Sequence, residues 1–457
     1  MSNLKVDLDL VQKYNVPGPR YTSYPPATQF HDRVTWPELE QQIVASQQPD
    51  RDLSLYFHIP FCQTLCWYCG CTTVITTQHS QSAQYLQYLD KEMGMITRLL
   101  NPERKVVQLH FGGGSPTFLA PEEIRELGGY IHKHFKFSPH IEAGVEIDPR
   151  RMTRHHVTAL REVGFNRASI GVQDFNPEVQ KAVHRIQPRE ETENVINWVR
   201  EAGFNSLNVD LIYGLPYQTL ESFEKTLDQI LELAPDRLAI FSYAHVPWIK
   251  PAQKILENAL PTPETKFQIL KLITEKLTHD GLYVYIGMDH FAKASDELAV
   301  AQKNKSLQRN FQGYSTRSGV DIYSFGMSSI SQVANVYWQN QKELPDYYAA
   351  LDAGKMPLAK GYILTKEDQI RRQTIMRLMC DLSLDYAAMS KLLGIDFPNY
   401  FASELNSLAD LEADQLVTRD ASGITVTNGG RLFIRNIAMR FDAYLATMKE
   451  RRFSRTI

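Results

Sequence analysis

The amino-acid sequence predicts an α/β fold built on a parallel sheet, followed by a mainly helical C-terminal region. Two patterns predict this architecture. Short apolar stretches alternate with amphipathic stretches from about residue 50 to about residue 290, and helical patterns dominate after about residue 360. The length of 457 residues exceeds what one ordinary hydrophobic core accommodates, so we expect two or three domains.

Several stretches have the character of buried parallel strands, because they are short, apolar and rich in β-branched and aromatic residues. They are residues 53–59, 106–111, 143–148, 167–172, 207–214, 237–243 and 283–288. Helical patterns separate them, as at residues 82–100, 121–135, 191–203 and 220–234. This alternation predicts a parallel sheet, and it fits a complete or partial (β/α) barrel and an open doubly wound sheet equally well.

Regions of different character flank this α/β region. Residues 1–35 are predicted to form an N-terminal arm, because the proline- and tyrosine-rich segment 16–30 leaves little room for a long helix. We therefore assign residues 36–360 to the α/β domain and residues 361–457 to a mainly helical C-terminal domain. Within the last domain the patterns predict helices over 366–384, 400–416 and 430–450, and a small hairpin over 416–430.

Composition excludes some classes of protein. Hydrophobic residues make up 43% and charged residues 22%, as in ordinary globular proteins. The formal net charge of −3 predicts no general attraction to nucleic acid or to anionic lipid. No apolar run is long enough for a membrane-spanning helix, and the first residues do not have the pattern of a signal peptide. We therefore expect a cytoplasmic protein with neither a nucleic-acid partner nor a membrane partner.

The cysteines are the strongest chemical signal. Four of the five lie within ten residues, at Cys62, Cys66, Cys69 and Cys71, and Cys380 lies far from them. A tight group in a cytoplasmic protein indicates metal binding rather than a disulfide framework. The C-x3-C-x2-C spacing provides three thiolates for one [4Fe–4S] cube and leaves one iron open to a small molecule. The alternative is zinc bound by all four cysteines, although zinc usually joins two separated C-x2-C pairs.

A glycine run and several polar strand ends accompany the cysteine loop. Residues 112–114 follow a predicted strand, and three glycines allow close backbone approach to a ligand and exposed N–H groups. The alternative is a tight strand-to-helix turn. The strands also end in polar side chains, among them Glu146, Gln173 and Asp210. Together they predict one ligand-binding face, with Arg185 either reaching back over it or lying at the surface, although each residue alone is equally well explained as a cap or salt-bridge partner.

A cysteine motif directly after the first strand is the signature of the radical S-adenosylmethionine (SAM) superfamily. Over its whole length the chain further resembles the oxygen-independent coproporphyrinogen III oxidase family. The motifs that carry this resemblance are residues 17–25, 54–62, 66–71, 110–117, 171–175, 208–216, 288–292 and 309–314. The resemblance implies a partial or complete (β/α) barrel of radical SAM type, a [4Fe–4S] cluster on Cys62, Cys66 and Cys69, and two SAM molecules.

The resemblance also implies a reaction, namely anaerobic oxidative decarboxylation of coproporphyrinogen III to protoporphyrinogen IX by means of a 5′-deoxyadenosyl radical. It implies a porphyrinogen substrate and an unidentified electron donor, and we expect a monomer. The alternative within the superfamily is a haem-chaperone relative without oxidase activity. Such relatives generally lack the motif at 17–25, Cys71 and the motif at 309–314, all of which this chain has.

Site residues carry over from the resemblance by position. It places Tyr56, Gly113, Glu146 and Ile330 at the first SAM, and Tyr68, Gly114, Ser115, Gln173, Arg185, Asp210 and Ala244 at the second. Tyr56, Arg20, Phe311 and Gln312 are the candidate substrate-side residues. Arg20 either binds a propionate through two parallel hydrogen bonds or anchors the arm. Cys71 is not a cluster ligand in the family, so it is either a small packed residue or a neighbour of the second SAM.

One departure from the family pattern affects the site. Ser324 stands where the family has a glycine, in the segment that leads to Ile330. Because glycine permits backbone conformations that serine avoids, this substitution puts the local backbone at Ile330 in question.

Overall fold

The computed structural model describes residues 3–445 and 453–456, and the chain forms two compact units. Unit 1 comprises residues 1–28, 212–318 and 364–457, and unit 2 comprises residues 29–211 and 319–363. The N-terminal arm therefore groups with the C-terminal region, although the two are far apart in the sequence.

Unit 2 is built on a sheet in which six neighbouring strands run parallel. Their order is β13 (Asp321–Phe325), β1 (Leu53–Ile59), β4 (Lys105–Gly113), β5 (Lys136–Ile147), β6 (Arg167–Gln173) and β7 (Ser206–Tyr213), the last of which runs on into unit 1 after Leu211. Antiparallel strands extend the edge beyond β13, namely β14 (Ile330–Val333), β15 (Val336–Asn340) and β16 (Leu358–Ile363). Most of β1 is buried, as expected of a parallel strand with both faces covered.

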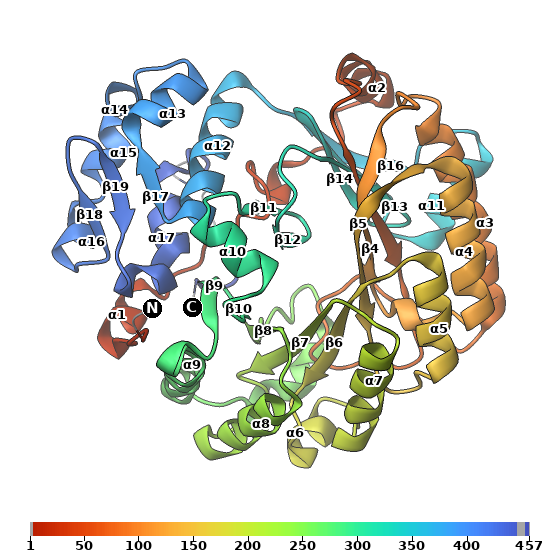
Figure 1. Ribbon diagram of the computed structural model, residues 1–457, viewed down its shortest axis with the longest axis horizontal. Coiled ribbons are helices and arrows are strands. Elements are labelled where there is room, and N and C mark those ends of the chain that lie inside the picture. Colours follow the sequence, from red (N-terminus) through yellow and green to blue (C-terminus); the bar gives the residue numbers. More distant parts are fainter. Residues whose placement is uncertain (1–2, 446–452, 457) are drawn as a thin grey trace. The chain divides into compact units, whose positions relative to one another are not determined.

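Helices connect the parallel strands of unit 2. They are α3 (His79–Thr97), α4 (Pro121–His134), α5 (Arg154–Val163), α6 (Pro177–Ala182) and α7 (Arg189–Glu201). Figure 1 shows α3, α4 and α5 next to one another along the strands. Close approach of α4 and α5 depends on Gly128, because a Cβ atom there would lie 2.5 Å from a methyl group of Val163. Further helices of this unit are α2 (Trp36–Ala45) and α11 (Leu344–Asp352).

Within unit 1, β8 (Arg237–Ser242), β10 (His290–Ala292) and β9 (Val284–Gly287) lie side by side in this order as the end of the 12-stranded sheet, and β10 is antiparallel to both of the others. The helices of this unit before residue 318 are α8 (Leu220–Leu233), α9 (Pro263–Thr278) and α10 (Glu297–Lys303), and a hairpin joins β11 (Gln308–Asn310) to β12 (Gly313–Ser315). The C-terminal part starts with α12 (Lys366–Asp381) and α13 (Tyr386–Leu393). Val11 and Tyr14 of the arm helix α1 (Leu8–Tyr14) pack into the same hydrophobic core as this C-terminal part.

The α/β fold class is confirmed, and the strands at 53–59, 106–111, 143–148, 167–172 and 207–214 lie side by side and parallel. The expectation of a parallel strand at 283–288 is wrong, because β9 pairs antiparallel with β10. The sequence also missed β13, the parallel neighbour of β1. That strand begins with Asp321, which is fully buried between Arg51 and Arg104, so its apolar signal is weak.

The C-terminal helices are shorter than predicted. Residues 400–416 do not form one helix but contain the last residue of α14 (Phe397–Tyr400) and two short helices, α15 (Ala402–Asn406) and α16 (Ala409–Ala413). The first break occurs at Phe401, whose ψ of 23° is not helical. The predicted hairpin forms between β18 (Val417–Arg419) and β19 (Gly423–Val426), and β17 (Ser383–Asp385) extends it.

The last predicted helix, over 430–450, is only α17 (Ile434–Ala438), flanked by 3-10 turns, and residues 446–450 lie outside the described residues. Among the helices that the structure describes, none has both the length and the apolar character required to cross a membrane.

Candidate active site

The cysteine loop follows β1 directly, as the sequence predicts. Cys62 ends the short strand β2 (Phe61–Cys62), which pairs in parallel with β3 (Val74–Ile75). Hydrogen bonds close the base of the loop, from the Val74 amide to the Pro60 carbonyl at 2.8 Å and from the Thr76 amide to the Cys62 carbonyl at 2.9 Å. Residues 62–74 therefore form a loop of unit 2 whose two ends lie side by side.

A second anchor fixes the far side of the loop. The Trp67 amide donates to the Val183 carbonyl at 3.0 Å, and the Trp67 ring stacks on His184 with centroids 5.2 Å apart. Nδ1 of His184 lies 2.9 Å from the Leu65 carbonyl. These contacts hold the loop against the segment after β6, so the loop is positioned independently of any metal.

Two arginines face the sulfur of Cys66. Their Nη atoms lie 3.6 Å (Arg150) and 3.7 Å (Arg185) from Sγ of Cys66. Asp148 holds both guanidinium groups, with Nη2 of Arg150 at 2.6 Å and Nη1 of Arg185 at 3.2 Å. Burial alone would raise the pKa of Asp148, but Arg185 and Arg150 keep it well below its usual range. Asp148 therefore stays charged and orients both arginines.

The residues of the loop fit a [4Fe–4S] cluster. All its cysteines are free thiols, and the guanidinium groups of Arg150 and Arg185 lie next to the sulfur of Cys66. Within the described residues, no three His, Cys, Asp or Glu side chains are grouped closely enough for a single metal ion, so the zinc alternative gains no support. Thiolates around a cube bind different irons and need not converge on one point.

Cys71 lies beside this set. Its amide donates to Sγ of Cys69 at 3.4 Å, and its side chain is exposed.

The glycine run packs against the base of the cysteine loop. The Gly114 amide donates to the Ile59 carbonyl at 2.8 Å, and the Ser115 amide donates to the Phe61 carbonyl at 3.0 Å. A Cβ atom on Gly114 would lie 2.5 Å from the Pro60 carbonyl oxygen. The expectation of an exposed N–H group is wrong for Gly114, because its amide is bonded to the chain itself.

Glu146 lies at the centre of a group of residues assigned to the first SAM. It accepts hydrogen bonds from the Gly113 amide and from Nε2 of His110, each at 3.3 Å. The ring of Tyr56 stacks on His110, with centroids 5.9 Å apart and planes 12° from parallel. These hydrogen bonds outweigh the effect of burial and lower the pKa of Glu146, so it carries a negative charge at neutral pH. Tyr56, Gly113 and Glu146 therefore form one group at the strand ends.

Ser324 is accommodated without strain. It lies in β13 directly beside Tyr56 of β1, and its φ is negative. Its hydroxyl donates to the Ile330 carbonyl at 2.6 Å. The substitution of the family glycine therefore fastens Ile330 to the sheet.

A second group surrounds the ends of β6 and β7. Arg185 is buried and does reach back over the strand ends, since it donates to the Gly171 carbonyl at 2.8 Å. A Cβ atom on Gly171 would lie 2.8 Å from Nε2 of Gln173 and 3.4 Å from Nη2 of Arg185, so both side chains pack closely over this glycine. Tyr68 belongs to the cysteine loop, where burial raises the pKa of its hydroxyl.

Asp210 lies beside Gly171 in the sheet and is hydrogen-bonded on both oxygens. Ser169 donates at 2.9 Å and Asn208 donates at 2.7 Å. Burial raises the pKa of Asp210 to about 6, with a further contribution from the charge of Glu146, and the hydrogen bonds offset only part of this shift. Asp210 is thus a carboxylate near neutral pH that loses its charge on mild acidification.

The remaining predicted residues belong to unit 1. Ala244 follows β8, and Phe311 and Gln312 form the turn between β11 and β12. Arg20 forms an ion pair with Asp289, as expected of an anchor for the arm.

Sequence reasoning missed the roles of Arg150, Ser169 and Asn208. The role of Asn208 could have been predicted from the sequence. Residues two apart in a strand share a face, and Asp210 was already a predicted site residue.

Comparisons with known proteins agree along the whole chain. Residues 56–230 match the radical SAM superfamily, and residues 364–433 match the HemN C-terminal domain. The chain is 44% identical to the oxygen-independent coproporphyrinogen III oxidase of Pseudomonas aeruginosa over 100% of both proteins. It is 47% identical to that of Escherichia coli, over 99% of this chain and 98% of the relative. The solved structure of the Escherichia coli coproporphyrinogen III oxidase, a radical SAM enzyme, superposes with a TM-score of 0.92 and covers 97% of this chain and 100% of its own.

Proposed function

Because the chain belongs to the oxygen-independent coproporphyrinogen III oxidase family of radical SAM enzymes, we propose that it converts coproporphyrinogen III to protoporphyrinogen IX without oxygen. In this reaction the propionates on rings A and B become vinyl groups. Each conversion removes a hydrogen atom from the β-carbon, releases CO2 and passes on one further electron. The observation that carries the proposal is the anchored loop with three free thiols beside Glu146 and Asp210.

The chain's own residues bind and orient the cofactors. Cys62, Cys66 and Cys69 are the ligands for the cluster, and Arg150 and Arg185 compensate its negative charge. When bound, the cluster and SAM supply one-electron cleavage of the sulfonium and the 5′-deoxyadenosyl radical.

Two groups of residues at the strand ends support two SAM sites. Glu146, charged and close to Tyr56 and Gly113, is suited to an ammonium group. Asp210 is suited to ribose hydroxyls, and Arg185 to a carboxylate through charge-assisted hydrogen bonds. The two groups are separate, since Glu146 lies on β5 and Asp210 lies on β7, with β6 between them. The proposal includes a cytoplasmic monomer that receives its electron from a separate donor.

Anaerobic turnover tests the proposal. Protein reconstituted with iron and sulfide is incubated with coproporphyrinogen III, SAM and a reductant, and the porphyrins are separated by chromatography. We expect protoporphyrinogen IX and 5′-deoxyadenosine from the wild type and from Cys71→Ala, and neither product from Cys66→Ala. A fully loaded wild type that leaves the propionates intact would contradict the proposal. Stoichiometric haem binding in that case would favour the haem-chaperone alternative.

A further inference from the structure

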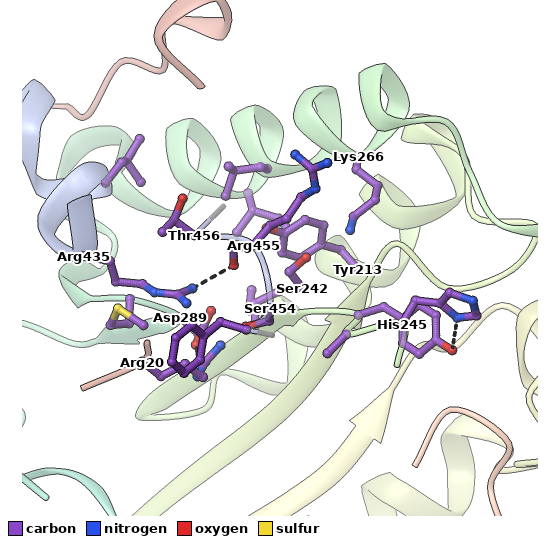
Figure 2. A pocket seen from close by; sticks show the side chains of 18 of the residues that line it. Arg20, Tyr213, Ser242, His245, Lys266, Asp289, Arg435, Ser454, Arg455 and Thr456 are labelled. Atoms are coloured by element: carbon purple, nitrogen blue, oxygen red, sulfur yellow. Dashed lines mark hydrogen bonds and ion pairs between the residues drawn. The ribbon is translucent and has the colours of Figure 1, made fainter. Parts of the chain in front are cut away.

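Unit 1 contains a cavity of about 540 Å³, a volume typical of small-molecule sites (Figure 2). Strands β8 and β9, helix α9, the N-terminal arm and residues 453–456 contribute to its wall. Part of the lining is apolar and includes Ile240, Ile273, Tyr285, Phe291 and Leu432. The cavity therefore offers an apolar surface to a ligand of moderate size.

The charges that line this cavity do not balance. Four of the lining residues are arginine or lysine, namely Arg20, Lys266, Arg435 and Arg455, and Asp289 is the one carboxylate among the described residues of the wall. Asp289 is already paired with Arg20. Three cations therefore face the cavity without a carboxylate partner among the described residues.

Arg435 is the most deeply placed of these cations, with an exposed fraction of 4%. Its guanidinium donates to the carbonyls of Gly18, Pro19 (3.1 Å) and Arg455 (2.9 Å). Carbonyl oxygens satisfy the N–H groups but do not neutralise the charge. Burial, together with the charge of Arg20, lowers the pKa of Arg435 to about 9, and the charge of Asp289 offsets only part of this shift.

Lys266 approaches the same cavity from α9. Its ammonium group forms neither a hydrogen bond nor an ion pair with any residue that the structure describes, and burial followed by the charge of Arg455 lowers its pKa. Figure 2 shows Lys266 and Arg435 on different sides of the cavity, with Tyr213 and Arg455 between them. An ammonium group in such a place is stabilised when an anion enters.

We propose that this cavity binds carboxylate side chains of the porphyrinogen, with Lys266 and Arg435 as the cations that neutralise them. The assignment rests on the proposed function, because coproporphyrinogen III combines apolar pyrrole rings with several propionates. The apolar lining suits the rings, and the unpaired cations suit the carboxylates.

Lys266→Met in the reconstituted holoenzyme is the test. Arg435 also fastens the arm, so its variants are expected to disturb folding, whereas Lys266 forms no such contact with the described residues. We expect the KM for coproporphyrinogen III to rise about tenfold to a hundredfold, the equivalent of one hydrogen bond to a charged group. Lys266→Arg should restore most of the affinity, and Lys303→Met, an exposed lysine of the same unit, should behave as wild type.

A binding measurement separates this inference from the proposed function. Fluorescence titration with coproporphyrin III and with its neutral tetramethyl ester requires no turnover. The wild type should prefer the free acid, and Lys266→Met should lose most of that preference. Equal binding of acid and ester by the wild type, or an unchanged preference in Lys266→Met, would overturn the inference even if the wild type converts coproporphyrinogen III. Absence of turnover together with the expected preference would contradict only the proposed function.

Discussion

Cations that are partly or fully buried occur in both units, but the two sets differ in whether a carboxylate lies beside them. Beside the cysteine loop of unit 2, Arg150 and Arg185 share the carboxylate of Asp148. In the cavity of unit 1, Arg435 and Lys266 have no carboxylate partner among the described residues. The first arrangement gives both arginines a carboxylate partner that holds them in position, although one positive charge is left over. The second becomes balanced only when an anion enters, which is the property expected of a site for an acidic substrate.

The largest expected effect concerns the cysteines. Cys62→Ala, Cys66→Ala and Cys69→Ala should each abolish the cluster, because each removes a thiolate from a cube that has only three protein ligands. Cys71→Ala should keep about four irons per chain, the content of one [4Fe–4S] cube. Iron and sulfide analysis of anaerobically reconstituted protein measures this difference. Loss of iron in Cys71→Ala, or zinc without iron in the wild type, would refute the ligand assignment.

Removal of the carboxylate at 148 should have the next largest effect. Asp148→Asn leaves the buried guanidinium of Arg185 and the partly exposed one of Arg150 without their counter-charge; breaking a fully buried pair costs about 3–5 kcal/mol, which is the upper limit for this change. Denaturant unfolding of the variant measures the loss of stability. Asp352→Asn is the matched control, because its ion pair with Lys91 is exposed and should contribute very little. Equal stability of the two variants would show that the Asp148 network is not a structural element.

A smaller effect is expected at the second SAM group. Asp210→Ala and Arg185→Ala should keep the iron of the wild type but lose about 1.5–3 kcal/mol of SAM binding, or roughly ten- to a hundredfold in affinity. Iron content and bound SAM are measured on the same anaerobic preparations. Wild-type affinity in both variants would show that these residues are structural and that the second site does not exist here.

Asp210 also predicts a pH dependence. Its pKa of about 6 lies above the usual range, so the carboxylate gains a proton and loses its charge as the pH falls through about 6. SAM affinity should decrease over this interval in the wild type and be independent of pH there in Asp210→Asn. Calorimetric titration at a series of pH values provides the measurement, and an identical pH profile in both proteins would count against a role for the carboxylate.

Ionic strength should have the smallest effect and should distinguish the two regions. Added salt screens the attraction between the cations of unit 1 and an acidic substrate, so the KM for coproporphyrinogen III should rise modestly. The charges around the cysteine loop are already paired at contact distance, so the KM for SAM should change less. Steady-state kinetics at two salt concentrations test this difference. A larger increase in the KM for SAM than in the KM for coproporphyrinogen III would contradict it.

Local patterns were sufficient to predict most of the parallel strands of unit 2, the helices between them and the cysteine loop. Strands such as 53–59 and 106–111 are continuous apolar runs, and the spacing of Cys62, Cys66 and Cys69 is itself a chemical signature. The strand at 321–325 was missed because Asp321 is buried by pairing with Arg51 and Arg104, which are far away in the sequence. No local sequence pattern predicts a partner that is so distant along the chain.

The charge imbalance of unit 1 is also invisible in the sequence. Arg435 and Lys266 are separated by well over a hundred residues and lie in ordinary helical patterns. Only the folded chain brings them to one cavity and leaves them without a carboxylate partner among the described residues. The glycine run shows the converse, since its pattern was clear but did not reveal that Gly114 and Ser115 are hydrogen-bonded to residues 59–61 of the chain itself.

A crossed kinetic comparison tests the central claim most directly, namely that Asp210 of unit 2 contributes to SAM binding and that Lys266 of unit 1 contributes to substrate binding. The KM values for SAM and for coproporphyrinogen III are measured anaerobically for wild type, Asp210→Asn and Lys266→Met. The account predicts that Asp210→Asn raises only the KM for SAM and that Lys266→Met raises only the KM for coproporphyrinogen III. Equal increases for both ligands in either variant, or a rise in the KM for SAM alone in Lys266→Met, would contradict it.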